Sequence, residues 1–269
     1  MGRNKIDRTG EKGYNNFGSE MISINFYMKF NDKRKRNDSY IDVYFPEYDW
    51  TFKGATYPSF KKGNIKCPYE RRYYGIGYLG EGEYKPTENR KPTRVYDSWH
   101  SMLQRCYDGK FQEKYPTYKD CKVCDEWLNF QNFAQWYEEN FYEIKSQQMS
   151  LDKDILIKHN KIYSPETCIY VPQTINTLFV KCDSKRGESA IGTYHYKNSK
   201  YQAHCSLINP KTGKSKFKHL GYYNTELEAF EVYKYYKEKN IKIVADYFKN
   251  LIPQKLYQAL YNYEVEIDD

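Results

Sequence analysis

Two stretches of sequence decide the fold at one end of this chain: GTYHYKNSKYQAHC at residues 192–205 and KHLGYYNTELEAFEVYKYYKEK at residues 218–239. Aromatic residues in both stretches, with the Pro and Gly of a turn at 209–213, indicate antiparallel strands. The apolar residues then recur at helical spacing. We therefore predict a three-stranded sheet packed on a helix over residues 225–240, with a second helix at 241–248.

The predicted helix has a clear start. Asn224 or Thr225 is a suitable cap, and Glu226 and Glu228 place negative charge in the first turn. The apolar face of the helix follows from these positions: Leu227, Ala229, Phe230, Val232, Tyr233 and Tyr236.

Positive charge is concentrated on the predicted sheet. Residues 189–225 contain six lysines and no aspartate or glutamate. Lysines gain free energy by displacing counterions from phosphates, and aromatic rings and amides on a sheet can contact bases and sugars. A solvated basic face is the alternative interpretation. The predicted DNA-binding residues are Tyr194, Tyr196, Lys197, Lys200, Tyr201, Lys214, Lys216, Lys218 and His219.

The same two stretches resemble the DNA-binding domain of the plant ethylene-response factors, which phage and bacterial homing endonucleases also carry. The matching positions are Gly192, Thr193, Tyr201, Ala203, Leu220, Gly221, Tyr223, Thr225, Glu228, Ala229 and Tyr233. In that family the sheet enters the major groove through arginines and tryptophans, so the resemblance implies double-stranded DNA as the partner. Tyr194 and Tyr196 stand where arginine is common, and Asn198 where tryptophan is common. The target sequence is therefore not transferable.

A second resemblance lies in SLDKDILIKHNKIYSPETCIYVPQTIN at residues 150–176, which is similar to the ββα-metal core of HNH homing endonucleases. Asp152 matches the metal-side acid of that family, and Asn176 matches the ligand on its helix. Pro165, Glu166 and Cys168 match the turn before the second strand. The resemblance implies that Asp152 and Asn176 bind Mg²⁺ or another divalent metal, which neutralises the leaving phosphate oxygen.

Two positions depart from the HNH pattern. Lys153 stands in place of the general-base histidine, and Thr167 in place of a structural asparagine. A lysine with an ordinary pKa of about 10.4 is a poor base at neutral pH and is expected to bind phosphate instead. His159 in the following loop is the candidate substitute for the base. Two interpretations stay open: a metal-dependent endonuclease, and a catalytically inactive DNA-binding regulator.

The rest of the chain predicts an α+β fold in three parts: a small β module at residues 1–85, helices plus the ββα-like unit at 93–180, and the DNA-reading domain at 189–250. Alternating Ile, Val and Phe predict strands at 21–27 and 40–45, separated by a basic loop. Helical spacing of apolar residues predicts helices over 95–107 and 129–141, and a basic linker follows at 181–188.

Seven cysteines form an odd set, which argues against a disulfide framework. Cys121 and Cys124 form a CxxC pair, and Cys106 and His100 lie nearby in sequence, which gives four potential ligands for structural zinc. His100 and Cys106 are six residues apart on a helix and so point to different faces. Buried free thiols are the favoured interpretation over zinc.

The composition of the chain indicates which classes of partner to expect. The 269-residue chain has a formal net charge of +8, which favours polyanionic partners. No apolar run approaches the roughly 18 to 20 residues that cross a bilayer, and the start lacks a secretory signal. We expect an intracellular protein without a membrane partner. Its Lys, Asn, Ile and Tyr bias hints at a low-GC bacterium or its phage. An RNA-binding or anti-defence interaction protein is a third functional class.

Overall fold

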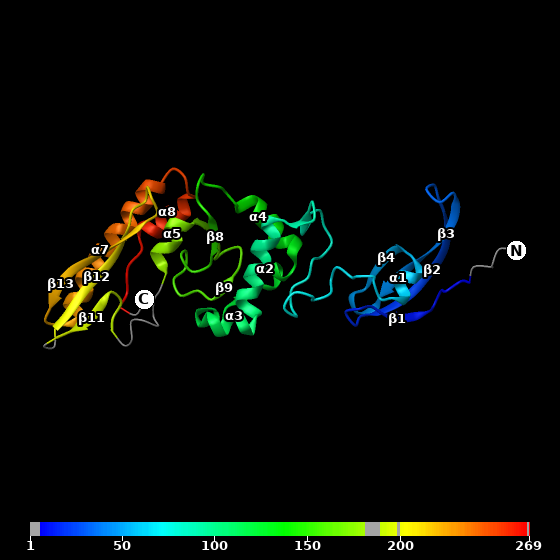
Figure 1. Cartoon of the computed structure of the whole chain (residues 1–269), viewed down its shortest axis with the longest axis horizontal. Helices are drawn as coiled ribbons and strands as arrows, with labels where there is room; N and C mark the ends of the chain where they lie inside the picture. The colour runs from blue at the N-terminus through cyan, green and yellow to red at the C-terminus, as the bar shows by residue number, and fades with distance from the viewer. Residues whose placement is uncertain (1–5, 181–188, 198–199, 268) are drawn as a thin grey trace. The chain divides into compact units, whose positions relative to one another are not determined.

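The computed structural model describes residues 6–180, 189–197, 200–267 and 269 (Figure 1). It has an α+β fold, as predicted, and divides into two compact units, Met1–Tyr137 and Glu138–Asp269. The predicted linker at 181–188 and Asn198 lie outside the described residues. Within the described ranges, every helix is too short or too polar to cross a bilayer.

The first unit begins with an antiparallel sheet in the order β1-β2-β3-β4. Its elements are β1 (Lys12–Tyr14), β2 (Glu20–Asn31), β3 (Arg36–Phe45), the 3-10 helix η1 (Pro46–Tyr48), β4 (Trp50–Ala55) and α1 (Tyr57–Lys61). Apolar residues of the sheet pack against Phe60 of α1. The strands predicted at 21–27 and 40–45 are confirmed as parts of β2 and β3, but the basic loop between them is shorter than expected. Strand pairing runs as far as Asn31 opposite Arg36, so only residues 32–35 form the turn.

The helical part of the first unit follows these strands. Its elements are β5 (Thr87–Glu88), β6 (Lys91–Pro92), α2 (Arg94–Tyr107), α3 (Gly109–Lys114), η2 (Pro116–Tyr118), β7 (Lys122–Val123), η3 (Asp125–Leu128) and α4 (Phe130–Asn140). The two helices predicted from apolar spacing are confirmed as α2 and α4. Trp99 of α2 is fully buried, and its indole N–H donates to the Trp127 carbonyl at 2.7 Å. That bond fixes α2 against the segment before α4.

The second unit contains the predicted strand, strand, helix order. Its first elements are β8 (Met149–Asp152), β9 (Ile162–Tyr163), β10 (Ile169–Pro172), α5 (Gln173–Asn176) and η4 (Thr177–Phe179). Strands β8 and β10 are antiparallel, with Asp152 opposite Ile169. Helix α5 packs against both strands.

A three-stranded antiparallel sheet in the order β11-β12-β13 completes the fold with two helices. Its elements are β11 (Thr193–Tyr196), β12 (Lys200–Ile208), β13 (Ser215–Tyr223), α7 (Glu226–Phe248) and α8 (Gln254–Tyr261). Thr225 accepts from the Glu228 amide at 3.2 Å while the Glu228 carboxylate accepts from the Thr225 amide, forming a capping box. Gly192 has a φ of +76°, and a Cβ there would lie 2.1 Å from the Tyr233 ring. Only glycine fits that contact.

The prediction of two helices after residue 225 is wrong, because α7 is continuous for 23 residues. We expected a break at Asn240, a residue that often ends helices. Its amide instead bonds the backbone of β12: it accepts from the Ile208 N–H at 2.8 Å and donates to the Ile208 carbonyl at 3.0 Å. The side chain at the predicted break therefore connects the helix to the sheet.

Helix α7 contributes side chains to two hydrophobic cores along its length. Its first half packs on the sheet, where Phe230 and Tyr233 belong to the same core cluster as Cys205. Its second half packs on the ββα-like unit and α8, in a core made of Ile155, Ile169, Val171, Ile175, Leu178, Ile208, Ile241, Val244, Ala245, Phe248, Ile252, Leu256 and Leu260. The sheet and the ββα-like unit therefore belong to one compact body joined by a shared helix.

Candidate functional site

We use the term outer face for the side of the β11-β12-β13 sheet that is turned away from α7. Ala203 and Cys205 of β12 are buried on the α7 side. Since successive side chains of a strand point to opposite sides, Gln202, His204 and Ser206 lie on the outer face. The strand register adds these residues to it: Tyr194, Tyr196, Lys200, Phe217, His219 and Tyr222.

Six rings form a continuous row on the outer face. The contacts between ring centroids are Tyr194–His204 at 5.2 Å, His204–Phe217 at 4.6 Å, His204–His219 at 5.0 Å, His219–Tyr222 at 4.7 Å and Tyr196–Tyr222 at 4.6 Å. Phe217 is 62% exposed and Tyr222 is 52% exposed. Apolar rings left this open on a strand contribute little to the core, so they are available to a partner.

A bulge keeps the row continuous. The pairing shifts between Ala203 and His204, so His219 lies opposite His204 while Gly221 lies opposite Ala203. Leu220 is the extra residue, and Gly221 takes a φ of +129°, which favours glycine. His219 and Tyr222 are three positions apart, so strict alternation without a bulge would place them on opposite sides of the sheet.

Histidine chemistry adds a titratable element to the outer face. Burial, together with the neighbouring charge of His219, lowers the pKa of His204. Each imidazole can donate or accept hydrogen bonds, as the amide of Gln202 beside them can.

The sheet divides the predicted DNA-binding residues between its two sides. Tyr194, Tyr196, Lys200 and His219 lie on the outer face, as described above. Lys197 and Lys214 lie in the turns, and both are exposed. The remaining three, Tyr201, Lys216 and Lys218, are directed to the α7 side.

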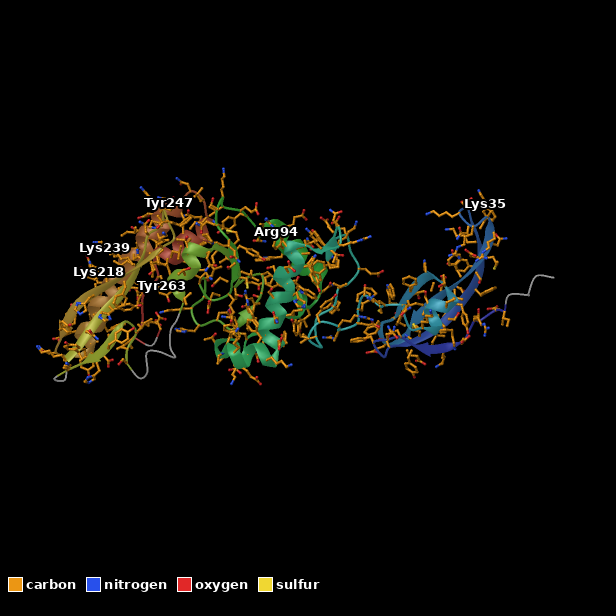
Figure 2. The ribbon with its side chains drawn as sticks, in the orientation of Figure 1. Lys35, Arg94, Lys218, Lys239, Tyr247 and Tyr263 are labelled. Atoms are coloured by element: carbon orange, nitrogen blue, oxygen red, sulfur yellow. The ribbon has the colours of Figure 1, made fainter. Side chains whose placement is uncertain are left out.

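Lys218 shows the consequence of pointing toward α7 (Figure 2). Its ammonium lies 4.3 Å from the centre of the Tyr236 ring, a cation–π contact within the domain. Sequence reasoning placed His204 beside the basic residues of this sheet but gave no site role to three outer-face residues, namely Gln202, Phe217 and Tyr222. Alternation along β12 and the Leu220-Gly221 pair are the signals that would have found them.

The ββα-like unit holds Asp152 at the end of β8. Its Oδ1 accepts from the Ile155 N–H at 2.8 Å and from the Asp154 N–H at 3.0 Å, closing the loop after the strand. Within the described part of the chain, Oδ2 has no hydrogen-bond partner. Burial, with the nearby charge of Asp154, raises the pKa of Asp152 to about 6. One oxygen therefore holds the loop and the other is available.

Asn176 ends α5, the helix that follows β10 and packs against β8. Both predicted metal ligands thus belong to the same small β-β-α motif. No hydrogen bond between Asp152 and Asn176 occurs among the residues the structure describes.

Lys153 is buried rather than presented to a phosphate. Its ammonium pairs with the Asp154 carboxylate at 3.0 Å and lies 5.9 Å from the centre of the Tyr163 ring. The expectation that it binds phosphate therefore conflicts with its surroundings, because the charge is neutralised inside its own loop.

His159 belongs to an ionic cluster that connects its loop to residues 264–269. Its Nε2 lies 3.3 Å from Glu266 Oε2, and the Lys158 ammonium lies 2.9 Å from carboxylate oxygens of both Glu266 and Asp269. Lys158 also donates to the Glu264 carbonyl at 2.9 Å. In the described ranges no hydrogen bond connects His159 with Asp152, and its proposed role as a base stays a prediction.

Metal-ligating side chains assemble at one place in the part of the chain that is described. There, the ligand atoms of His159, Glu266 and Asp269 lie within 4.8 Å of one another. The Lys158 ammonium pairs with both carboxylates, so the cluster is explained as an ion-pair network.

Among the residues that the structure describes, Cys121 and Cys124 do not belong to such a group. Cys121 is buried with its thiol 3.9 Å from the Thr117 carbonyl. His100 stands against the ring of Tyr74, at 5.2 Å between centroids. A structural zinc site formed by these residues gains no support from their positions.

Comparisons with family models, with curated proteins and with solved structures find no match to this chain.

Proposed function

We propose that this chain binds double-stranded DNA in a sequence-directed manner through the outer face of its C-terminal sheet. The observation that carries the proposal is the row of six exposed or half-exposed rings on a sheet whose surrounding segment, residues 189–225, has six lysines and no carboxylate side chain. Lysines supply the affinity for phosphates, and rings, imidazoles and the Gln202 amide supply groups that contact base edges and sugars.

The test is selection of a binding site from a pool of randomised duplexes by the full chain, followed by fluorescence anisotropy on the enriched duplex. We expect Tyr222→Ala to weaken binding about ten-fold, since one good contact to a base is worth about 1 to 3 kcal/mol. The matched control is Tyr235→Ala, because Tyr235 is 59% exposed but lies on α7. It should leave affinity unchanged.

Three results would overturn the proposal. One is the absence of enrichment from the pool, and another is an equal loss in the two tyrosine variants. The third is tighter binding of single-stranded DNA or RNA of the same sequence, which would point to stacking on unpaired bases.

A second candidate function is metal-dependent cleavage of DNA phosphodiesters by the ββα-like unit. The observation in its favour is the available Oδ2 of Asp152, on a partly buried carboxylate with a raised pKa. Asp152, together with Asn176, would hold a divalent metal, and such a metal neutralises charge on the leaving oxygen. The buried Lys153 favours the alternative, a DNA-binding regulator without catalysis.

Plasmid nicking with magnesium or manganese separates these two functions. An endonuclease should nick the plasmid, and Asp152→Ala should abolish the activity. Glu231→Ala is the matched control, because Glu231 is an exposed carboxylate of α7 in the same compact unit. Equal background from the unaltered protein and Asp152→Ala would eliminate the catalytic function and leave DNA binding.

A further inference from the structure

The far end of the β2–β3 hairpin is a two-stranded ribbon without a sheet to support it. Strand β1 pairs only with residues 20–22 of β2, and β4 pairs with β3 only from Ile41 onward. Residues 28–31 and 36–39 therefore pair only with each other in the sheet. Lys35 lies at the end of this ribbon (Figure 2).

The tip of the ribbon is strongly basic. Four consecutive cations, Lys33 to Arg36, are exposed in or beside the turn. Asp38 braces the two arginines, with Arg36 Nε at 2.9 Å and Arg34 at 3.5 Å from its carboxylate oxygens. In the described residues, Lys33 and Lys35 have no ion-pair partner within 4 Å, so their charge is available to a polyanion.

One side of the ribbon carries two exposed apolar side chains. Met28 is 43% exposed and Phe30 is 53% exposed, on the same side of β2. No core cluster includes either side chain among the described residues. In the major groove of DNA, apolar side chains such as Phe can contact the methyl group of thymine.

The size of the ribbon fits a groove of duplex DNA. Four paired residues at about 3.4 Å each, plus the turn, reach farther than the depth of the major groove, which is about 8.5 Å. That groove accepts a two-stranded ribbon, whereas the major groove of A-form RNA is too narrow. Two apolar side chains are too few for stable insertion into a lipid surface, where affinity grows with buried apolar area.

We propose that the β2–β3 ribbon is a second DNA-binding element: Lys33 and Lys35 contact phosphates, and Met28 and Phe30 lie against the groove. This element is independent of the C-terminal outer face. It gives residues 1–85 a role that the sequence alone did not assign.

The experiment measures binding of the full chain to a duplex of arbitrary sequence at several salt concentrations. Replacing both lysines (K33Q/K35Q) should reduce the slope of log affinity against log salt by about 2, because each phosphate contact releases about 0.9 counterions. The matched control is K62Q/K66Q, which removes two exposed lysines of the same module outside the ribbon and should leave the slope unchanged. K33R/K35R, which keeps the charge, should retain the original slope.

Equal slopes for K33Q/K35Q and K62Q/K66Q would overturn the inference. So would a loss of binding to vesicles containing phosphatidylserine without any loss of duplex binding, which would identify a membrane-binding hairpin. Phe30→Ser should weaken duplex binding several-fold at constant slope. If Tyr222→Ala weakens duplex binding and K33Q/K35Q leaves the salt slope unchanged, the proposed function stands and the inference about the ribbon fails. If only K33Q/K35Q has an effect, the ribbon binds DNA and the proposed function of the outer face fails.

Discussion

Two parts of the same compact body, the sheet with α7 and the ββα-like unit, each contain residues on which a sequence resemblance was based, but those residues have different roles. In the sheet and α7, Gly192, Thr225 and Glu228 have backbone tasks that the structure makes explicit. In the ββα-like unit, Asp152 is expected to perform chemistry, yet one of its oxygens closes a loop. The local geometry of the structure thus explains why residues with a backbone role are present. It does not by itself explain a residue that is expected to take part in catalysis.

Thr167 shows the same distinction at a position that departs from the HNH pattern. It replaces an asparagine of the HNH pattern, yet its hydroxyl donates to the Ile162 carbonyl at 2.7 Å and accepts from the Ser164 N–H at 3.2 Å. A different side chain therefore still holds the turn. Lys153, the other departure, has no comparable way to replace a histidine base, since its ammonium is neutralised by Asp154.

Gly192→Ala should give the largest effect and tests the backbone side of the comparison. The new Cβ would collide with the Tyr233 ring, and the φ of +76° disfavours any other residue. We expect a loss of about 3 kcal/mol in the free energy of unfolding, measured by urea denaturation. Gly109→Ala is the control, because a Cβ there meets nothing within 4 Å. Equal stability of the two variants would contradict the contact.

Asp152→Asn tests the chemical side through pH. The folded pKa of about 6 lies above the ordinary value of 3.8, so the carboxyl stabilises the fold below pH 4, and this contribution is lost as pH rises through 6. Asparagine keeps an acceptor for the loop without the charge. Relative to that of the unaltered protein, the free energy of unfolding of Asp152→Asn should therefore increase by about 2 kcal/mol from pH 4.5 to pH 8.

The measurement is urea unfolding at both pH values. A pH-independent difference would show that Asp152 titrates normally. Adding magnesium at pH 8 sharpens the comparison, since a metal held by Asp152 should stabilise the unaltered protein and leave Asp152→Asn unchanged.

Thr225→Ala should give the smallest effect. It removes the acceptor for the Glu228 amide and half of the capping box, at a cost of about 1 kcal/mol in the free energy of unfolding. Thr225→Ser should keep the cap. If alanine and serine destabilise α7 equally, the methyl group rather than the hydroxyl is responsible.

The sequence predicted the fold class, the main helices and the order of strands because these depend on local periodicity and on turn residues. It missed the continuity of α7, because the bonds between Asn240 and Ile208 join residues 32 positions apart. It missed Tyr222 because a bulge between His219 and Gly221 changes which side chains share a face. The environments of Lys153 and His159 depend on burial and on the distant Glu266, which local patterns do not encode.

The shared helix α7 also bears on how such a chain can be assembled from interchangeable parts. A DNA-reading domain attached by a linker can be exchanged by joining chains within the linker. Here the side chains of Ile241, Val244 and Phe248 belong to the core of the neighbouring unit. A piece limited to the sheet and α7 would expose that apolar stripe to water, and the ββα-like unit left behind would lose one wall of its core. The sheet and the ββα-like unit therefore cannot be exchanged independently. A recombination that replaces one of them must also supply a second half of α7 that fits the core of the other.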